Sequence, residues 1–139
     1  MTDFNPKTNE LGCGFTVLNM TPHTINVLDV DGRTRPLAPS GFSLRVNTQK
    51  GDKIETVMGI EIFSPDTSGE VVIFNTATKE VVGDMSNIPE MKSQILIVSG
   101  MVGAVLKRED ILVPMTAPSD NPLRNEKGHI VAVRGLKRP

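Results

Sequence analysis

Hydrophobic and polar residues alternate along several short stretches of the chain. Phe42, Leu44 and Val46, for example, are separated by polar residues. Because successive side chains of a β-strand point to opposite faces, this period of two predicts a strand with one buried face. Turn-forming residues separate such stretches, and the Asp31-Gly32 pair predicts a hairpin with a type I′ turn.

The whole pattern predicts about eight or nine short strands and one short helix. The helix is expected at 100–109, where apolar residues recur at helical spacing and Ser99 can act as the N-cap. The stretch 94–98 is apolar on both faces and predicts a central strand. Ten segments are candidates for these strands, of which 34–37 can be irregular and 80–82 is very short: 15–20, 24–29, 34–37, 41–46, 54–63 (one strand bent at Gly59), 70–75, 80–82, 94–98, 111–113 and 129–134.

These elements indicate a mainly β fold at the border of the α+β class, either a small β-barrel or a sandwich. With 139 residues the chain is expected to form one domain. Residues 1–14 are mostly polar and contain Pro6, so they predict a disordered tail before a single β-rich domain over 15–139. Cys13 is the only cysteine, which excludes an internal disulfide.

Composition and charge narrow the classes of partner. The net charge of −1 and the isoelectric point near 6.1 argue against nucleic acid, whose binding needs a basic face. No apolar run is long enough to cross a membrane, and no leader precedes the first strand, so we expect a soluble protein of the cytoplasm. Homo-oligomerisation is expected because a small β domain with an edge strand tends to assemble.

Catalytic motifs are missing from the sequence, and we expect no enzyme, no cofactor and no metal. Two histidines and one cysteine are too few and too scattered for a typical metal site. A hydrolase built from Ser99, His23 and Asp110 is one alternative, although any domain of this size offers such a set.

Six residues are candidates for binding a small ligand. The Thr21-Pro22-His23 corner interrupts two strands and holds an imidazole, whose charge can change within the physiological pH range. The strand that ends at Ser99-Gly100 leads into a helix start, where backbone N–H groups can receive a phosphate. Guanidinium groups suit anions as well. The candidate residues are Thr21, His23, Arg45, Ser99, Gly100 and Arg124.

Each candidate also has a structural interpretation. Thr21 and His23 can bond backbone groups left unpaired by the strand break, and Ser99 can be an ordinary helix cap. Surface arginines commonly make solvated contacts of little net energy.

Several motifs taken in order resemble a small family of uncharacterised accessory proteins of bacteriophages and prophage-bearing bacteria. The match spans roughly residues 15–137, and it departs from the family pattern at Ala132, where a Gly is expected, and at Val133, where a Cys is expected. The motifs are Leu18-Asn-Met-Thr-Pro-His23, Ala38-Pro-Ser-Gly41 followed by Leu44-Arg-Val46, Ile88-Pro-Glu90, Ile97-Val-Ser99 with Met101-Val-Gly-Ala104, Asp110-Ile-Leu-Val-Pro114, Leu123-Arg124 with Gly128, and Val131 to Leu136.

This resemblance implies phage origin and action in the cytoplasm of a bacterial host. It leads to the hypothesis of a counter-defence protein that sequesters a small anionic or nucleotide-like host signal. The alternatives are a virion-associated or host-protein-binding interaction protein without a small ligand, and a small hydrolase.

Overall fold

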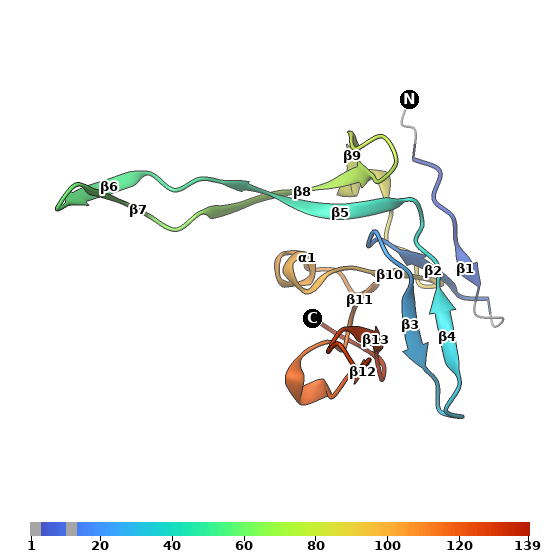
Figure 1. Ribbon diagram of the computed structural model, residues 1–139. Helices are drawn as coiled ribbons and strands as arrows, with labels where there is room; N and C mark the ends of the chain where they lie inside the picture. Colours follow the sequence, from blue (N-terminus) through green and yellow to red (C-terminus); the bar gives the residue numbers. More distant parts are fainter. Residues whose placement is uncertain (1–3, 11–13) are drawn as a thin grey trace.

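The computed structural model describes residues 4–10 and 14–139 as a β-rich body from which one long arm projects (Figure 1). A five-stranded sheet runs through the body in the order β1-β2-β10-β11-β14. Its three inner strands are parallel, and the outer two are antiparallel to their neighbours. The strands are β1 (Asn9–Glu10), β2 (Thr16–Asn19), β10 (Gln94–Ile97), β11 (Ile111–Pro114) and β14 (Leu136–Lys137).

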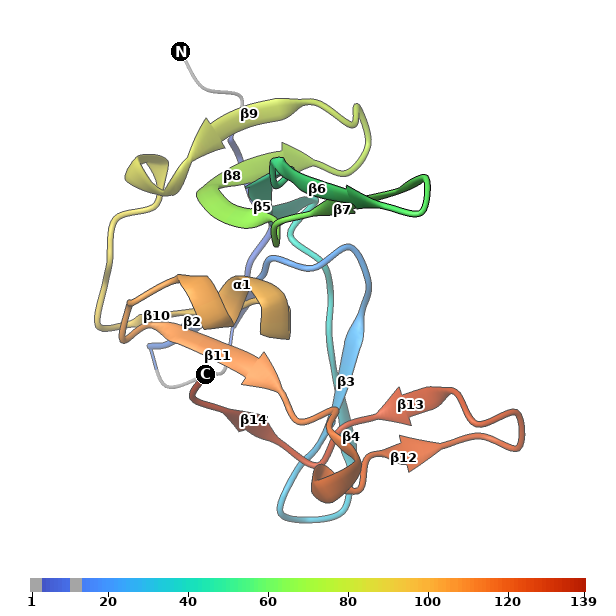
Figure 2. The ribbon, with the colours of Figure 1, turned by 90° about the vertical axis from the view of Figure 1, so that its left-hand side faces the viewer.

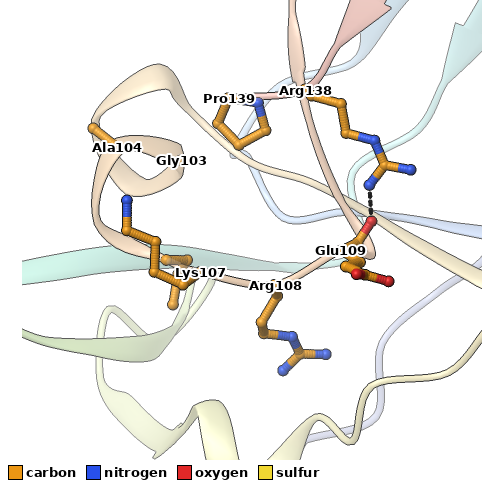
Figure 3. A pocket seen from close by; sticks show the side chains of 8 residues that line it. Gly103, Ala104, Lys107, Arg108, Glu109, Arg138 and Pro139 are labelled. Atoms are coloured by element: carbon orange, nitrogen blue, oxygen red, sulfur yellow. Dashed lines mark hydrogen bonds between the residues drawn. The ribbon is translucent and has the colours of Figure 1, made fainter.

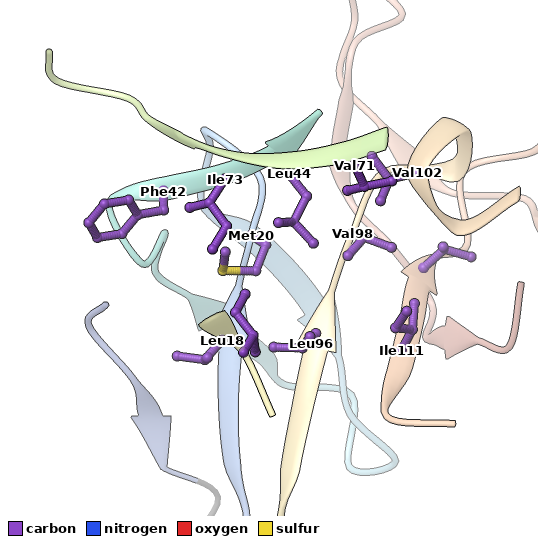
Figure 4. Packing of buried hydrophobic residues seen from close by; sticks show 12 residues of the cluster. Leu18, Met20, Phe42, Leu44, Val71, Ile73, Leu96, Val98, Val102 and Ile111 are labelled. Carbon is purple, nitrogen blue, oxygen red and sulfur yellow. The ribbon is translucent and has the colours of Figure 1, made fainter. Parts of the chain in front are cut away.

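A second sheet packs over one face of the first through the main hydrophobic core (Figure 4). It consists of β5 (Phe42–Gln49), β8 (Thr67–Asn75) and β9 (Val81–Asp84), and the short 3₁₀ helix η1 (Met85–Asn87) follows it. Because β-strand side chains alternate between faces, every second residue of the facing strands enters this layer. The buried side chains between the sheets include Leu18, Met20, Phe42, Leu44, Ile73, Leu96 and Val98.

The only α-helix in the described part of the chain, α1 (Gly100–Val105), lies beside β11 and the second sheet (Figure 2). Its Val102 side chain is buried, and Gly103 is packed tightly against Val113 and Pro139.

Two small hairpins lie on the side of the central sheet away from the second sheet, and the first of them covers part of that face (Figure 2). The first is β3 (Ile25–Leu28) with β4 (Thr34–Leu37), and its Leu37 packs on Val17 and Ile97. The second is β12 (Leu123–Arg124) with β13 (Ile130–Ala132), which follows the 3₁₀ helix η2 (Pro118–Asp120). The first hairpin and the central sheet form a second, smaller core, and β13 packs against β3.

The arm continues the β5–β8 pair beyond the body and ends in the hairpin of β6 (Lys53–Val57) and β7 (Ile60–Phe63) (Figure 1). Residues 47–58 alone extend by ~40 Å at the rise of a strand. All of β6 is exposed, as is β7 apart from the half-buried Ile62.

The expectation of a mainly β fold with one short helix is confirmed, as is the central position of 94–98. The described residues form fourteen strands, more than expected, because 54–63 belongs to two strands and because β1, β12 and β14, each two residues long, were not predicted as separate strands. The single bent strand predicted over 54–63 is wrong: Met58 and Gly59 take positive φ angles of 53° and 81° and form a tight turn.

The predicted hairpin at Asp31-Gly32 forms, but not with a type I′ turn. Of these two residues only Gly32 has a positive φ, because the Asp29 carboxylate accepts hydrogen bonds from the N–H groups of Asp31 and Arg33 and tightens the loop. The helix also ends earlier than expected. Leu106 is extended, and the chain turns so that Arg108 can reach Asp110.

The N-terminal segment is partly folded, contrary to the predicted tail. The Phe4 ring lies edge-on to that of Phe42 with centroids 4.9 Å apart, and Asn9 exchanges two hydrogen bonds with Ala38. Residues 4–10 therefore belong to the body, because Phe4 gains apolar burial that the sequence pattern did not reveal. The remainder of that prediction, including Cys13, falls on residues 1–3 and 11–13, outside the described residues.

Candidate functional site: a cleft at the Thr21–His23 corner

A cleft of about 400 Å³ opens where the corner between β2 and β3, the start of α1, the end of β11 and strand β13 meet. Its walls are mostly apolar, with hydroxyl, amide and imidazole groups at the rim. Such a composition is typical of sites for small molecules. The lining residues are Thr21, His23, Thr24, Ile25, Asn26, Ser99, Gly100, Pro114, Thr116, Ile130, Val131, Ala132 and Val133.

Four of the six residues predicted from the sequence line this one cleft: Thr21, His23, Ser99 and Gly100. The two segments that supply them are about 75 residues apart in the chain and are joined by the parallel pairing of β2 with β10. Because parallel strands end at the same edge of a sheet, the residues that follow β2 and β10 meet there.

Asn19 shapes the corner, and sequence reasoning missed it. Its side chain is fully buried; the amide nitrogen donates to the carbonyl of His23 (2.8 Å) and to that of Leu37 (2.9 Å). Its oxygen accepts from the hydroxyl (2.6 Å) and the N–H (3.1 Å) of Thr21. The available signal was a lone amide within the apolar strand Val17 to Met20, since a buried polar side chain must find partners.

The structural interpretation of Thr21 is therefore correct for its hydroxyl, which bonds Asn19 and the His23 carbonyl. The hydroxyl of Ser99 likewise accepts the N–H of Val102 (3.3 Å), as expected of an N-cap. Both oxygens keep further lone pairs for a ligand. The His23 side chain is exposed at the rim.

The two predicted arginines lie elsewhere. The Arg45 guanidinium stacks over the Phe74 ring, 4.1 Å from its centroid, on the outer face of the second sheet. Arg124 donates to the Gly128 carbonyl (2.8 Å) within its own hairpin. Neither lines the cleft, so His23 is the only titratable side chain among the described residues that do.

Asp110, the third member of the alternative hydrolase set, is also outside the cleft. Arg108 holds its carboxylate through two hydrogen bonds of 2.9 and 2.6 Å and donates a third to the Ile88 carbonyl. The structure therefore does not bring Ser99, His23 and Asp110 together in this cleft.

A second concave region lies at the chain's C-terminal end, beside α1. One part, of about 790 Å³, is bordered by Lys107, Arg108 and Arg138, and Arg138 donates to the Glu109 carbonyl (Figure 3). An adjoining part of about 840 Å³ has an apolar floor of Phe15, Ile95 and Leu112.

Comparison of the chain with models of protein families, with curated proteins and with solved structures finds no match. The site must therefore be interpreted from its own geometry.

Three carboxylates in the described part of the chain have lowered pKa values, and none of them lines the cleft. The pKa of Asp29 is lowered mainly by the Arg33 N–H, that of Asp84 by the Ser86 hydroxyl, and that of Asp120 by the Lys137 ammonium. These three carboxylates stabilise turns and the ends of secondary-structure elements.

Within residues 4–10 and 14–139, no three metal-ligating side chains come together, and no helix is long and apolar enough to cross a membrane.

Proposed function

We propose that this chain is a phage-encoded accessory protein that binds a small nucleotide-like molecule of the bacterial host in the cleft beside His23 and so withholds it from host defence. The observation that carries the proposal is the convergence of Thr21, His23, Ser99 and Gly100 on one cleft. The resemblance to phage accessory proteins supports the biological setting.

The cleft suits a ligand with a flat apolar part and a few polar groups. Ile25, Pro114 and Val133 offer an apolar surface for a ring. The Ser99 hydroxyl and the His23 imidazole can donate to phosphoryl oxygens, whereas the Thr21 hydroxyl, whose proton is donated within the corner, can accept from a ligand hydroxyl. With neither arginine present, the imidazolium form of His23 is the cation available to an anionic group there. A volume of about 400 Å³ favours a ligand of mononucleotide size.

The test is to purify the chain from host cells, release bound molecules by heat and identify them by mass spectrometry. In parallel, thermal shift with AMP, cyclic AMP and cyclic GMP should give stabilisation that is lost in His23→Ala and Ser99→Ala. Arg124→Ala is the matched control, because this residue lies outside the cleft, and it should bind as the unchanged chain does. An empty extract together with no thermal shift from any of these probes would count against the proposal.

The arm favours a second candidate function, an interaction protein of the virion or the host without a small ligand. An exposed β-ribbon with apolar side chains is typical of segments that pack on another chain. Affinity capture from infected cells tests this candidate with the full chain and with a variant in which Asn-Gly replaces 47–70. It requires a stoichiometric protein that only the full chain retains.

A further inference from the structure

The cleft beside His23 is lined almost wholly by uncharged groups. None of its lining residues, all of which belong to the described part of the chain, is Lys, Arg, Asp or Glu, and His23 alone can titrate there. The other polar side chains are neutral hydroxyl and amide groups, from Thr21, Thr24, Asn26, Ser99 and Thr116. At most one positive charge, that of an imidazolium, is therefore present to meet a charge on the ligand.

Charged side chains of the neighbouring segments are bonded elsewhere. Arg134 follows the lining residue Val133, and its Nε donates to the Asn121 carbonyl (2.7 Å). His129 precedes β13 and is not among the lining residues. Further charged groups near these segments bond within the chain: Arg124 to Gly128, Arg35 to Asp29 and Lys137 to Asp120. The surroundings of the cleft therefore add no second cation to its lining.

The start of α1 does not replace the missing cations. The N–H groups at a helix start attract anions, but α1 has only six residues, and the Ser99 hydroxyl already accepts from the Val102 N–H (3.3 Å). Ser99 can still donate its own proton to a phosphoryl oxygen. This end of the cleft therefore offers a neutral hydroxyl and no full positive charge.

Uncompensated charge on a ligand would be costly against the walls of the cleft. The apolar residues Ile25, Pro114 and Val133 line it, and a charged group placed against them gives up water without gaining a counter-charge. Phosphates that extended from the rim into solvent would keep their hydration but would gain no contact with the chain. Additional phosphate charges therefore either weaken binding or add nothing to it.

The Asn26 amide supplies recognition without charge. Its Nδ2 donates to the Val131 carbonyl (3.2 Å), and an amide beside a carbonyl turns its nitrogen toward that oxygen. The Asn26 oxygen and the second N–H are then left for a ligand, and both residues line the cleft. An acceptor beside a donor matches the edge of a nucleobase. The nucleoside part of a ligand can thus be held by neutral groups.

We infer that the ligand of this cleft carries one negative charge, on a phosphodiester, as a cyclic mononucleotide does. The neutral groups hold the nucleoside part, and His23 with Ser99 meets the one phosphate. A phosphodiester keeps a single charge near neutral pH, whereas a phosphomonoester approaches two charges because its second pKa is about 6. The inference rests on the proposed function and adds the charge class of the ligand to it.

Isothermal titration calorimetry tests the inference with nucleotides that share a base and differ in charge. The adenine series is adenosine, cyclic AMP, AMP and ATP, titrated at about pH 7.5 and constant ionic strength without Mg²⁺, and the matching guanine series covers the other purine. In the series that binds, the cyclic nucleotide should bind about tenfold more tightly than the nucleoside, as expected of one hydrogen bond to a charged group. The monophosphate and the triphosphate should bind no more tightly than the cyclic nucleotide.

Variants at the rim separate charge from shape. His23→Ala should bring the affinity for the cyclic nucleotide down to that of the nucleoside and leave the nucleoside within about twofold, because only the phosphate contact is lost. His23→Arg places a permanent cation there and should raise the affinity for the monophosphate relative to the cyclic nucleotide. Arg134→Ala is the matched control, since this nearby cation lies outside the lining, and it should bind as the unchanged chain does. Circular dichroism melting verifies that each variant is folded.

The outcomes separate this inference from the proposed function. A monophosphate or triphosphate that binds more tightly than the cyclic nucleotide overturns the inference and leaves the proposed function standing. Equal affinities for nucleoside and cyclic nucleotide do the same, as does a loss in Arg134→Ala as large as that in His23→Ala. A chain that binds no member of either series, and that yields no nucleotide on heating, overturns the proposed function and this inference with it.

Discussion

The side-chain amide of Asn19 lies 2.8 Å from the backbone carbonyl oxygen of His23 and holds the corner that presents His23 to the cleft. Since the same side chain also bonds Thr21 and Leu37, one buried residue ties β2, the corner and β4 together. The corner is thus built from within the body, and its shape does not depend on a ligand.

Replacing Asn19 with Ala should lower the free energy of unfolding by on the order of 3 kcal/mol, because buried carbonyl and N–H groups lose their partners. Urea denaturation measures this loss. Asn125→Ala is the control, since that side chain likewise bonds backbone groups, accepting from two N–H groups, but is exposed, and its loss should be clearly smaller. Equal losses for the two variants would show that Asn19 is not a structural centre of the site.

Breaking the Arg108–Asp110 pair should cost about 3–5 kcal/mol of unfolding free energy, because one buried charge is left without its partner. Asp110→Asn and Arg108→Met each test this in chemical denaturation. The double change Arg108→Met with Asp110→Leu should recover much of the loss, as apolar replacements of buried pairs commonly do. Additive losses in the double variant would contradict a coupled pair.

The contact between Asp120 and Lys137 should make stability depend on pH in the acid range. The Lys137 ammonium, 2.8 Å away, lowers the pKa of Asp120 below its ordinary value. A group whose folded pKa is lowered contributes stability above its ordinary pKa and loses it as the pH falls through the lowered value. In Lys137→Met, carboxyl NMR titration should show the pKa of Asp120 moving back up, and an unchanged titration would contradict this pairing.

Gly103→Ala should destabilise the chain by about 1–3 kcal/mol through overpacking. A Cβ at this position would lie 2.7 Å from a Val113 methyl carbon and 3.0 Å from the Pro139 ring. Gly100→Ala, in the same helix, meets nothing within 4 Å and should change stability by less than about 1 kcal/mol. Thermal melting of both variants measures the difference, and equal melting temperatures would contradict tight packing at α1.

Much of the candidate site follows from local signals. The Thr21-Pro22-His23 break and the Ser99-Gly100 helix start mark the ends of two strands, and the structure brings both to one cleft. The arginines show the limit of such reasoning. Whether Arg45 faces a cleft or covers Phe74 depends on which sheet face is open, and no local pattern contains that information.

The sequence by itself determined most of the strands through alternation, the N-cap through Ser99, and the hairpin through the turn residues around Gly32. Each of these features depends on residues only a few positions apart. Only the tertiary structure decided that β2, β10 and β11 pair in parallel and that Phe4 joins the core. It also decided that 54–63 folds back at Met58 into an arm. Those outcomes depend on contacts between segments that are far apart in the sequence. The energies of such contacts depend on how much apolar surface each segment buries against the others.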